Sequence, residues 1–159
     1  MKIITIFNIG TVLLAAVFAY SCAVGKLQCS DYVINSLYER KIYLPKTSAN
    51  GLDFHMRASQ QWRLIKRTPK GKLDHQSAFT AAKSGLTVIC AYNTGSSKSG
   101  HVAVVDGKKQ MFWSDKYKAS VPYVSGSVEG RKPVTEPLSY QFSADKEPKM
   151  SYYVYLNNN

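Results

Sequence analysis

Two residues of this sequence have types and surroundings that could carry covalent chemistry together, a cysteine and a histidine. Cys29 opens a segment with the apolar spacing of a helix, and His101 opens a β-branched run. The free amides and positive dipole at a helix N-terminus favour a thiolate and can stabilise a developing oxyanion. Such a thiol becomes a nucleophile when an imidazole lies within hydrogen-bonding distance. The sequence therefore predicts nucleophilic catalysis, although a histidine at a strand end can also be purely structural.

A third polar group is expected to accept a hydrogen bond from the other imidazole nitrogen and to fix its tautomer. The Asp-Gly pair at 106–107 predicts a tight hairpin between the strand opened by His101 and residues 109–113. A strict two-residue turn places Ser114 on the face of His101, whereas one extra turn residue or a bulge brings Asp115 there. We choose Asp115 because a carboxylate both fixes the tautomer and stabilises an imidazolium. Ser114 and a backbone carbonyl remain alternatives.

The other candidate side chains receive no catalytic role. Cys90 lies inside an apolar strand and is expected in the core, although a disulfide between Cys29 and Cys90 is the alternative in an oxidising compartment. His55 and His75 lie in polar helical surroundings and are expected to face solvent. The cysteines and histidines lack the close paired spacing of zinc sites, and no glycine-rich phosphate loop is present. We expect no metal and no cofactor.

The pattern of apolar residues predicts helices first and strands afterwards. Helices are expected at residues 29–40, 50–65 and 75–84, the last one ended by Gly85. Strands are expected at residues 86–92, 101–105, 109–113, 119–124, 138–142 and 151–156. This order predicts an α+β fold in which the helices pack on one side of an antiparallel sheet.

The N-terminus has the form of a secretory signal peptide. A lysine at position 2 precedes an apolar run at residues 3–20, and small residues follow at once. We expect a signal peptide at residues 1–23, a mature chain that begins between Cys22 and Lys26, and a single domain at residues 24–159. An uncleaved membrane anchor and a lipoprotein acylated at Cys22 are the alternatives. The protein is therefore expected to be secreted, or periplasmic in a bacterium.

Four motifs occur in an order that resembles one enzyme superfamily. They are CSDYV at a helix start, ANGLDFHM with a following tryptophan, VICAY in a strand and SGHVAVV in the next strand. Together, over roughly residues 27–115, they resemble the papain-like NlpC/P60 and CHAP amidases, most of all the type VI secretion amidase effectors and their domesticated, secreted relatives. The resemblance implies that Cys29 is the nucleophile, His101 the general base and Ser114 or Asp115 the orienting group. It implies cleavage of amide bonds in peptidoglycan stem peptides, and it favours a free Cys29.

The charge of the chain suits this substrate class. The 159 residues include 21 lysines and arginines against 10 acids, for a formal charge of +11, and basic residues concentrate between Lys41 and Lys83. A basic protein gathers at bacterial walls, which carry carboxylates and anionic polymers. We expect a monomer that acts on peptidoglycan, possesses affinity for anionic wall polymers and binds no nucleic acid. A cationic antimicrobial or wall-binding module without enzymatic activity and a secreted cysteine protease are the alternatives.

Overall fold

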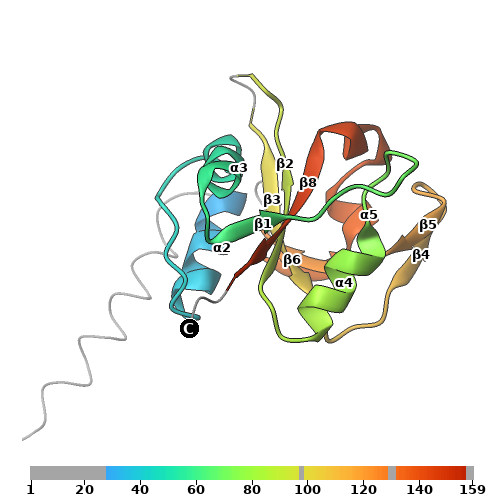
Figure 1. The fold of residues 1–159 in the computed structure, drawn as a ribbon, viewed down its shortest axis with the longest axis horizontal. Helices are drawn as coiled ribbons and strands as arrows, with labels where there is room; N and C mark the ends of the chain where they lie inside the picture. The colour runs from blue at the N-terminus through green and yellow to red at the C-terminus, as the bar shows by residue number, and fades with distance from the viewer. Residues whose placement is uncertain (1–27, 97–98, 129–131, 157–159) are drawn as a thin grey trace, which may run out of the picture.

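The computed structural model describes residues 28–96, 99–128 and 132–156, and the predicted signal peptide lies outside them (Figure 1). The described chain contains a six-stranded antiparallel sheet with the strand order β1-β8-β2-β3-β6-β7 and a separate hairpin of β4 and β5. The sheet strands are β1 (Trp62–Leu64), β2 (Val88–Tyr92), β3 (His101–Asp106), β6 (Tyr123–Gly126), β7 (Val134–Pro137) and β8 (Met150–Tyr155), and the hairpin strands are β4 (Phe112–Ser114) and β5 (Ala119–Val121). The helices are α2 (Cys29–Tyr38), α3 (Ala49–Ala58), α4 (His75–Lys83), α5 (Leu138–Gln141) and the 3₁₀ helix η1 (Ala144–Lys149). The predicted α+β class is confirmed.

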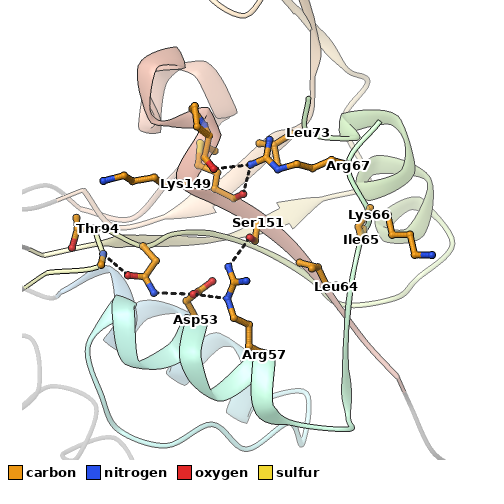
Figure 2. A pocket seen from close by; sticks show the side chains of 14 residues that line it. Asp53, Arg57, Leu64, Ile65, Lys66, Arg67, Leu73, Thr94, Lys149 and Ser151 are labelled. Carbon is orange, nitrogen blue, oxygen red and sulfur yellow. Dashed lines mark hydrogen bonds and ion pairs between the residues drawn. The ribbon is translucent and has the colours of Figure 1, made fainter. Parts of the chain in front are cut away.

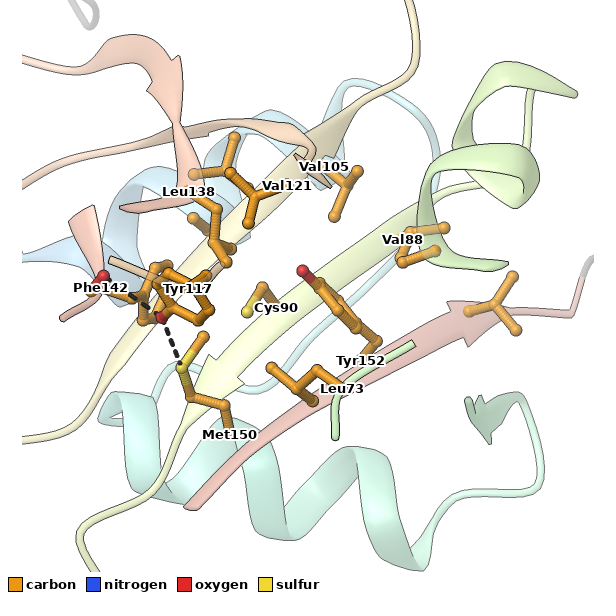
Figure 3. Packing of buried hydrophobic residues seen from close by; sticks show 14 residues of the cluster. Leu73, Val88, Cys90, Val105, Tyr117, Val121, Leu138, Phe142, Met150 and Tyr152 are labelled. Atoms are coloured by element: carbon orange, nitrogen blue, oxygen red, sulfur yellow. Dashed lines mark hydrogen bonds between the residues drawn. The ribbon is translucent and has the colours of Figure 1, made fainter. Parts of the chain in front are cut away.

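Both faces of the sheet are covered. Figure 1 shows α2 and α3 on one side of the sheet, with α4, α5 and the β4–β5 hairpin on the other. The side chains of the central strands point alternately to the two sides, and each side has its own core. Ile89 and Val102 pack in the core under α2 and α3. Cys90 and Ala103 pack in the core on the other side, part of which Figure 3 shows. The expectation of helices on one side is therefore wrong. The strands β2 and β3 are apolar at consecutive positions, so both faces of the sheet are apolar. Both faces must therefore be covered.

Helix α2 is positioned by its apolar stripe. Val33 and Leu37, one helical turn apart, are completely buried against the sheet. The helix begins at Cys29, and its first turn carries Asp31, which suits the positive end of the helix dipole. Burial of the stripe therefore fixes both the direction of α2 and the place of Cys29 at one end of the sheet.

One predicted element is wrong in extent and another is wrong in type. The expected helix at residues 50–65 ends at Ala58, and the chain then forms β1, because Trp62 packs on Tyr155 of β8 with ring centroids 5.1 Å apart. The expected strand at residues 138–142 is helix α5, which follows directly after Pro137. The backbone N–H of Leu138, its first residue, donates to the carbonyl oxygen of Pro122 at 2.9 Å. In both places, contacts with residues that are distant in the sequence decide an element that is short on its own.

The expected hairpin between the strand of His101 and residues 109–113 is also wrong. Strand β3 pairs with β2 and β6, whereas β4 pairs only with β5 among the described strands. Asp106 still forms a turn, in which its Oδ1 accepts from the backbone N–H of Lys108 at 2.8 Å. Gly107 has a packing role there, because a Cβ atom would collide with the backbone of Ala82 in α4. The turn therefore carries the chain out of the sheet and does not return it along β3.

Candidate functional site

The thiol of Cys29 lies against the backbone on both sides of His101. Its Sγ is 4.0 Å from the carbonyl oxygen of Gly100, and it also faces the backbone N–H of Val102. Gly100 and Val102 are the neighbours of His101 in the chain, so the structure brings the thiol beside the backbone of His101. The ring of His101 packs on Phe142, which belongs to the core on the other side of the sheet from Val102. Between the described side chains of Cys29 and His101 there is no direct hydrogen bond, since the thiol is directed at Gly100. Catalytic hydrogen bonds often tighten only when substrate binds.

Burial decides the protonation state of Cys29. Half-buried at the start of α2, the thiol has a pKa above its ordinary value because desolvation disfavours the thiolate, and this outweighs the lowering by the backbone N–H groups of Val102 and Ser30. We expected the helix N-terminus to favour a thiolate, and its amides do act in that direction. The net effect is the opposite one, so the resting group is a protonated thiol.

The ring of His101 is held between two residues of the chain that follows β7. It packs on Phe142 with centroids 4.7 Å apart, and its Nε2 lies 3.4 Å from Oε1 of Gln141. Burial lowers the pKa of His101, the hydrogen bond with Gln141 opposes this by raising it, and nearby Lys146 lowers it again. The imidazole is therefore neutral near pH 7 and able to accept a proton.

Gln141 fixes the tautomer of His101. The Nε2 of Gln141 donates to the carbonyl oxygens of Val124 and Val134, each at 3.3 Å. A reversed amide would set its oxygen against both carbonyls, so Oε1 must point to the histidine and accept from it. The proton of the neutral ring then sits on Nε2, and Nδ1 carries the lone pair that can take the thiol proton. In β6, Gly126 provides the space, since a Cβ atom there would lie 2.6 Å from Oε1 of Gln141.

Gln141 was missed from the sequence. It is separated from His101 by 40 residues, and the sequence predicts a strand for its segment where the structure has α5. The helical turn of α5 after Pro137 is what turns this side chain toward the sheet. No local spacing links the two residues, so only the pairing of β6 with β3 and β7 could have indicated the contact.

The predicted orienting residues lie elsewhere. Asp115 is in the turn of the β4–β5 hairpin with its side chain 84% exposed, where it accepts from Trp113 Nε1 at 3.3 Å and pairs with Lys118 at 3.7 Å. Ser114 is buried and accepts from the backbone N–H of Tyr117 at 3.4 Å. The prediction that Asp115 faces His101 is wrong because the hairpin on which it depended does not form.

The predictions for the other cysteines and histidines are partly confirmed and partly wrong. Both described cysteines are free, so the alternative of a Cys29–Cys90 disulfide is wrong, and Cys90 is buried in the core as expected. His55 is half-buried near the end of α3. His75 is buried, not solvent-facing, because its ring packs on Tyr152 and its Nδ1 lies 2.8 Å from the Tyr152 hydroxyl. Burial lowers the pKa of His75 to about 4.

The β2–β3 loop is fastened to helix α3. The side-chain amide of Asn50 donates to Oγ1 of Thr94 at 2.9 Å and to the carbonyl of Ser96 at 3.0 Å. A Cβ atom at Gly100 would collide with Asn50 and with the carbonyl of Tyr92, so only glycine fits between them. This close approach holds in place the backbone that contacts the Cys29 thiol.

A buried carboxylate anchors the other end of this loop (Figure 2). Asp53 in α3 is 1% exposed and accepts hydrogen bonds from the Tyr153 hydroxyl at 2.7 Å, Asn93 at 2.8 Å and Nε of Arg57 at 3.1 Å. Arg57 reaches on to Ser151 in β8 at 3.1 Å. Asp53 therefore connects α3, the start of the loop and β8, and both of its oxygens accept hydrogen bonds.

Three further findings concern metal binding, membrane spans and similarity to known proteins. Within the described residues, no group of three or more His, Cys, Asp or Glu side chains could hold a metal ion. None of the described helices is long and apolar enough to cross a membrane. No protein-family model matches this chain, and no curated protein matches it either.

Proposed function

We propose that this protein is a secreted cysteine amidase that hydrolyses amide bonds in the stem peptides of peptidoglycan and thereby kills bacteria. One observation carries the chemical part of the proposal. The Cys29 thiol, at the N-terminus of α2, lies against the backbone that flanks His101, and Gln141 holds the ring in the tautomer that leaves Nδ1 free. A nucleophile, a base and an orienting group are the three parts that such hydrolysis needs.

The reaction begins with a neutral pair. We infer that substrate binding brings the two side chains together: the thiol leaves the Gly100 carbonyl, and Nδ1 of His101 takes its proton as Sγ attacks the substrate carbonyl carbon. The developing oxyanion is stabilised by backbone N–H groups at the start of α2, where those of Cys29 and Ser30 already face the sulfur. Because both resting groups are uncharged, the charge appears only as the transition state forms.

Release of the products returns the enzyme to its starting state. The imidazolium of His101 gives its proton to the leaving nitrogen, the C–N bond breaks, and the acyl group remains on Sγ as a thioester. Water then attacks the thioester carbon while Nδ1 takes one proton, and the thiolate is released and reprotonated. The products are a carboxylic acid and an amine, and no cofactor takes part.

The substrate class rests on the resemblance of the four motifs and on charge. The formal charge of +11 favours a polyanionic surface outside the cell, which fits the secretory form of the N-terminus. The basic residues of the chain would concentrate the protein on the wall.

Digestion of purified peptidoglycan sacculi tests the proposal. We expect the wild-type protein to release fragments that mass spectrometry identifies as cut at a stem-peptide amide, and Cys29→Ala and His101→Gln to release none. Cys90→Ala and His55→Gln are the matched controls, and both should retain cleavage. Killing that persists in Cys29→Ala without cleavage would instead identify a cationic antimicrobial module. Cleavage of ordinary L-peptides such as casein, with intact sacculi, would identify a protease.

A further inference from the structure

Three aromatic rings contact one another beside the residues that hold His101. The ring centroid of Tyr140, the third residue of α5, lies 5.9 Å from that of Phe112 in β4. The centroid of Phe112 in turn lies 6.4 Å from that of Tyr123 in β6, and the amine of Lys109 lies over the Tyr123 ring at 4.9 Å. Three elements that are distant in the sequence therefore meet here, and we call their three rings the aromatic surface.

The ring of Tyr140 is open to solvent. Tyr140 is 61% exposed, and within the described residues its hydroxyl makes no hydrogen bond. The ring meets that of Phe112 at an interplanar angle of 67°, so the contact is edge to face and leaves a face of Tyr140 uncovered by Phe112. Single exposed apolar side chains are ordinary on protein surfaces, but rings that contact one another form a patch, and such patches mark binding sites.

The aromatic surface is joined to the candidate site through α5. Tyr140 is followed by Gln141, whose Oε1 lies 3.4 Å from Nε2 of His101. The next residue, Phe142, packs on the ring of His101. A ligand bound on Tyr140 is thus one residue away along the chain from the group that orients His101.

The chemistry of the aromatic surface indicates its partner. The face of an aromatic ring carries partial negative charge and attracts positively polarised C–H groups. A pyranose ring presents such C–H groups on its faces and hydroxyl groups at its edge, which the Tyr140 hydroxyl can meet. An anionic polymer would need several cations, but among the described residues Lys109 is the one cation in contact with these rings, and its amine already lies over Tyr123.

We propose that the aromatic surface binds the glycan strand of peptidoglycan, with a sugar ring stacked on Tyr140. This inference rests on the proposed function and adds a part of the substrate that is bound but not cut. Stem peptides are bonded covalently to the glycan strand, so a protein that attacks their amides meets sugar rings of the same molecule. Phe112 supports the Tyr140 ring from its side, and Lys109 covers Tyr123 at the other end of the surface.

Binding of a sugar chain that carries no peptide tests the aromatic surface. The probe is a neutral N-acetylglucosamine oligomer, and calorimetry with the Cys29→Ala protein measures its Kd. In this background Tyr140→Ala should raise the Kd about threefold to tenfold, the range of one aromatic contact. Tyr140→Phe keeps the ring and should raise the Kd less than about twofold. The matched control is Tyr43→Ala, which removes a 69% exposed tyrosine in edge contact with Tyr38 and should leave the Kd unchanged.

A second arm measures cleavage by the active protein. One substrate is a stem peptide that still carries its disaccharide, and the other is the same peptide alone. Tyr140→Ala should lower kcat/KM for the glycosylated substrate about threefold to tenfold and leave that for the free peptide unchanged. Equal losses on both substrates would show that Tyr140 acts through Gln141, and they would overturn the inference.

The inference is also overturned if the oligomer does not bind, or if Tyr140→Ala and Tyr43→Ala change its Kd equally. A Kd that rises steeply with salt would overturn it too, because the oligomer is neutral and its binding should not be screened. Oligomer binding by a wild-type protein that cleaves no sacculi would refute the proposed function and leave the aromatic surface standing as a glycan-binding site.

Discussion

Gln141 presents its Oε1 to Nε2 of His101 at 3.4 Å while its own Nε2 donates to the carbonyls of Val124 and Val134. The two carbonyls belong to neighbouring strands, β6 and β7, so the amide cannot turn over without breaking both bonds. A neutral amide thus does what a carboxylate was expected to do, namely fix the tautomer, without adding a negative charge beside the ring. Burial therefore still lowers the pKa of His101, although the hydrogen bond with Gln141 opposes it.

Replacing Gln141 by Leu should lower kcat and leave KM nearly unchanged. The ring then loses the group that keeps its proton on Nε2, and a fraction of molecules carries the proton on Nδ1 instead. We expect a loss of at least about tenfold, below the roughly 100- to 10,000-fold that general-base catalysis itself contributes. Steady-state kinetics on a soluble stem peptide measures both constants.

Gln110→Leu is the matched control for this variant, because Gln110 is an exposed amide outside the site. It should leave kcat unchanged. Equal activity of Gln141→Leu and the wild-type protein would show that the ring needs no orienting group, and the assignment of Gln141 as a positioning residue would be abandoned.

Gly126→Ala should reduce activity although the residue touches no reacting atom. Its new Cβ would lie 2.6 Å from Oε1 of Gln141 and 3.1 Å from the Cβ of Ala103, so the amide must move. A displacement of about 1 Å in a catalytic arrangement can cost up to about 100-fold in rate. The decisive measurement is a double-mutant cycle: the loss caused by Gly126→Ala should disappear in the Gln141→Leu background, and independent, multiplying losses would show that Gly126 acts by another route.

The acid limb of the pH profile should lie below the ordinary histidine pKa of 6.5. Activity requires neutral His101, and its pKa is lowered, so kcat/KM stays high as the pH falls past 6.5 and drops only at the lower value. The hydrogen bond from Gln141 raises this pKa, and its loss in Gln141→Leu should therefore move the limb to still lower pH. An acid limb above pH 6.5 would contradict the neutral resting pair.

Cys29 should react slowly with iodoacetamide at pH 7 in the absence of substrate. Its pKa lies above the ordinary value of 9.0, so the thiolate fraction at pH 7 is below about 1%. The rate should rise steeply above pH 9. The protein used begins at Ala23, so that Cys22 is absent; Cys29→Ser is the control, and it should remain unlabelled because Cys90 is completely buried. Fast labelling at pH 7 with an inflection below pH 8 would indicate a resting thiolate instead.

The folded protein should lose stability in mild acid because of His75. The pKa of His75 is about 4 when folded and 6.5 when unfolded, so the unfolded chain binds more protons in this interval. Stability is present above pH 6.5 and falls as the pH drops toward 4, by on the order of 3 kcal/mol. Urea unfolding at pH 7 and pH 4.5 measures the change.

His75→Asn is the variant that isolates this effect, since its side-chain amide can keep a polar atom near the Tyr152 hydroxyl. It should be less stable at pH 7 but should lose less stability between pH 7 and pH 4.5. An unaltered pH dependence in His75→Asn would assign the acid sensitivity to other groups.

The long elements of the fold could be predicted from the sequence because their patterns are local. Helix α4 begins at His75 as predicted, α2 begins at Cys29, and β2 and β3 lie within one or two residues of the expected ranges. Strands β1 and β7 were missed because each has only three or four residues, and their pairing with β8 and β6 is what stabilises them. In a segment this short, the sequence pattern is too weak to predict a strand that long-range pairing stabilises.

In the candidate site, too, residues with a local sequence signal could be predicted, and contacts between distant residues could not. Cys29 and His101 could be found because each opens an element and stands beside turn or loop residues. Asp115 was chosen from the register of a hairpin, and one wrong pairing removed it entirely. The burial of His75 was missed for a related reason, since its neighbours in the sequence are polar while its neighbours in space are Tyr117 and Tyr152.

Among the described strands β8 comes last in the sequence, yet it lies inside the sheet between β1 and β2. While the chain is being synthesised, β1 and β2 therefore have an empty place between them until Met150–Tyr155 emerges. Cys29, His101 and Gln141 all precede this strand, so an unfinished or truncated chain would contain all three and still lack the sheet that assembles them. Pairing across such distances along the chain is slow. The order of the strands thus makes the synthesis of β8 the step after which the sheet, and the candidate site with it, can assemble.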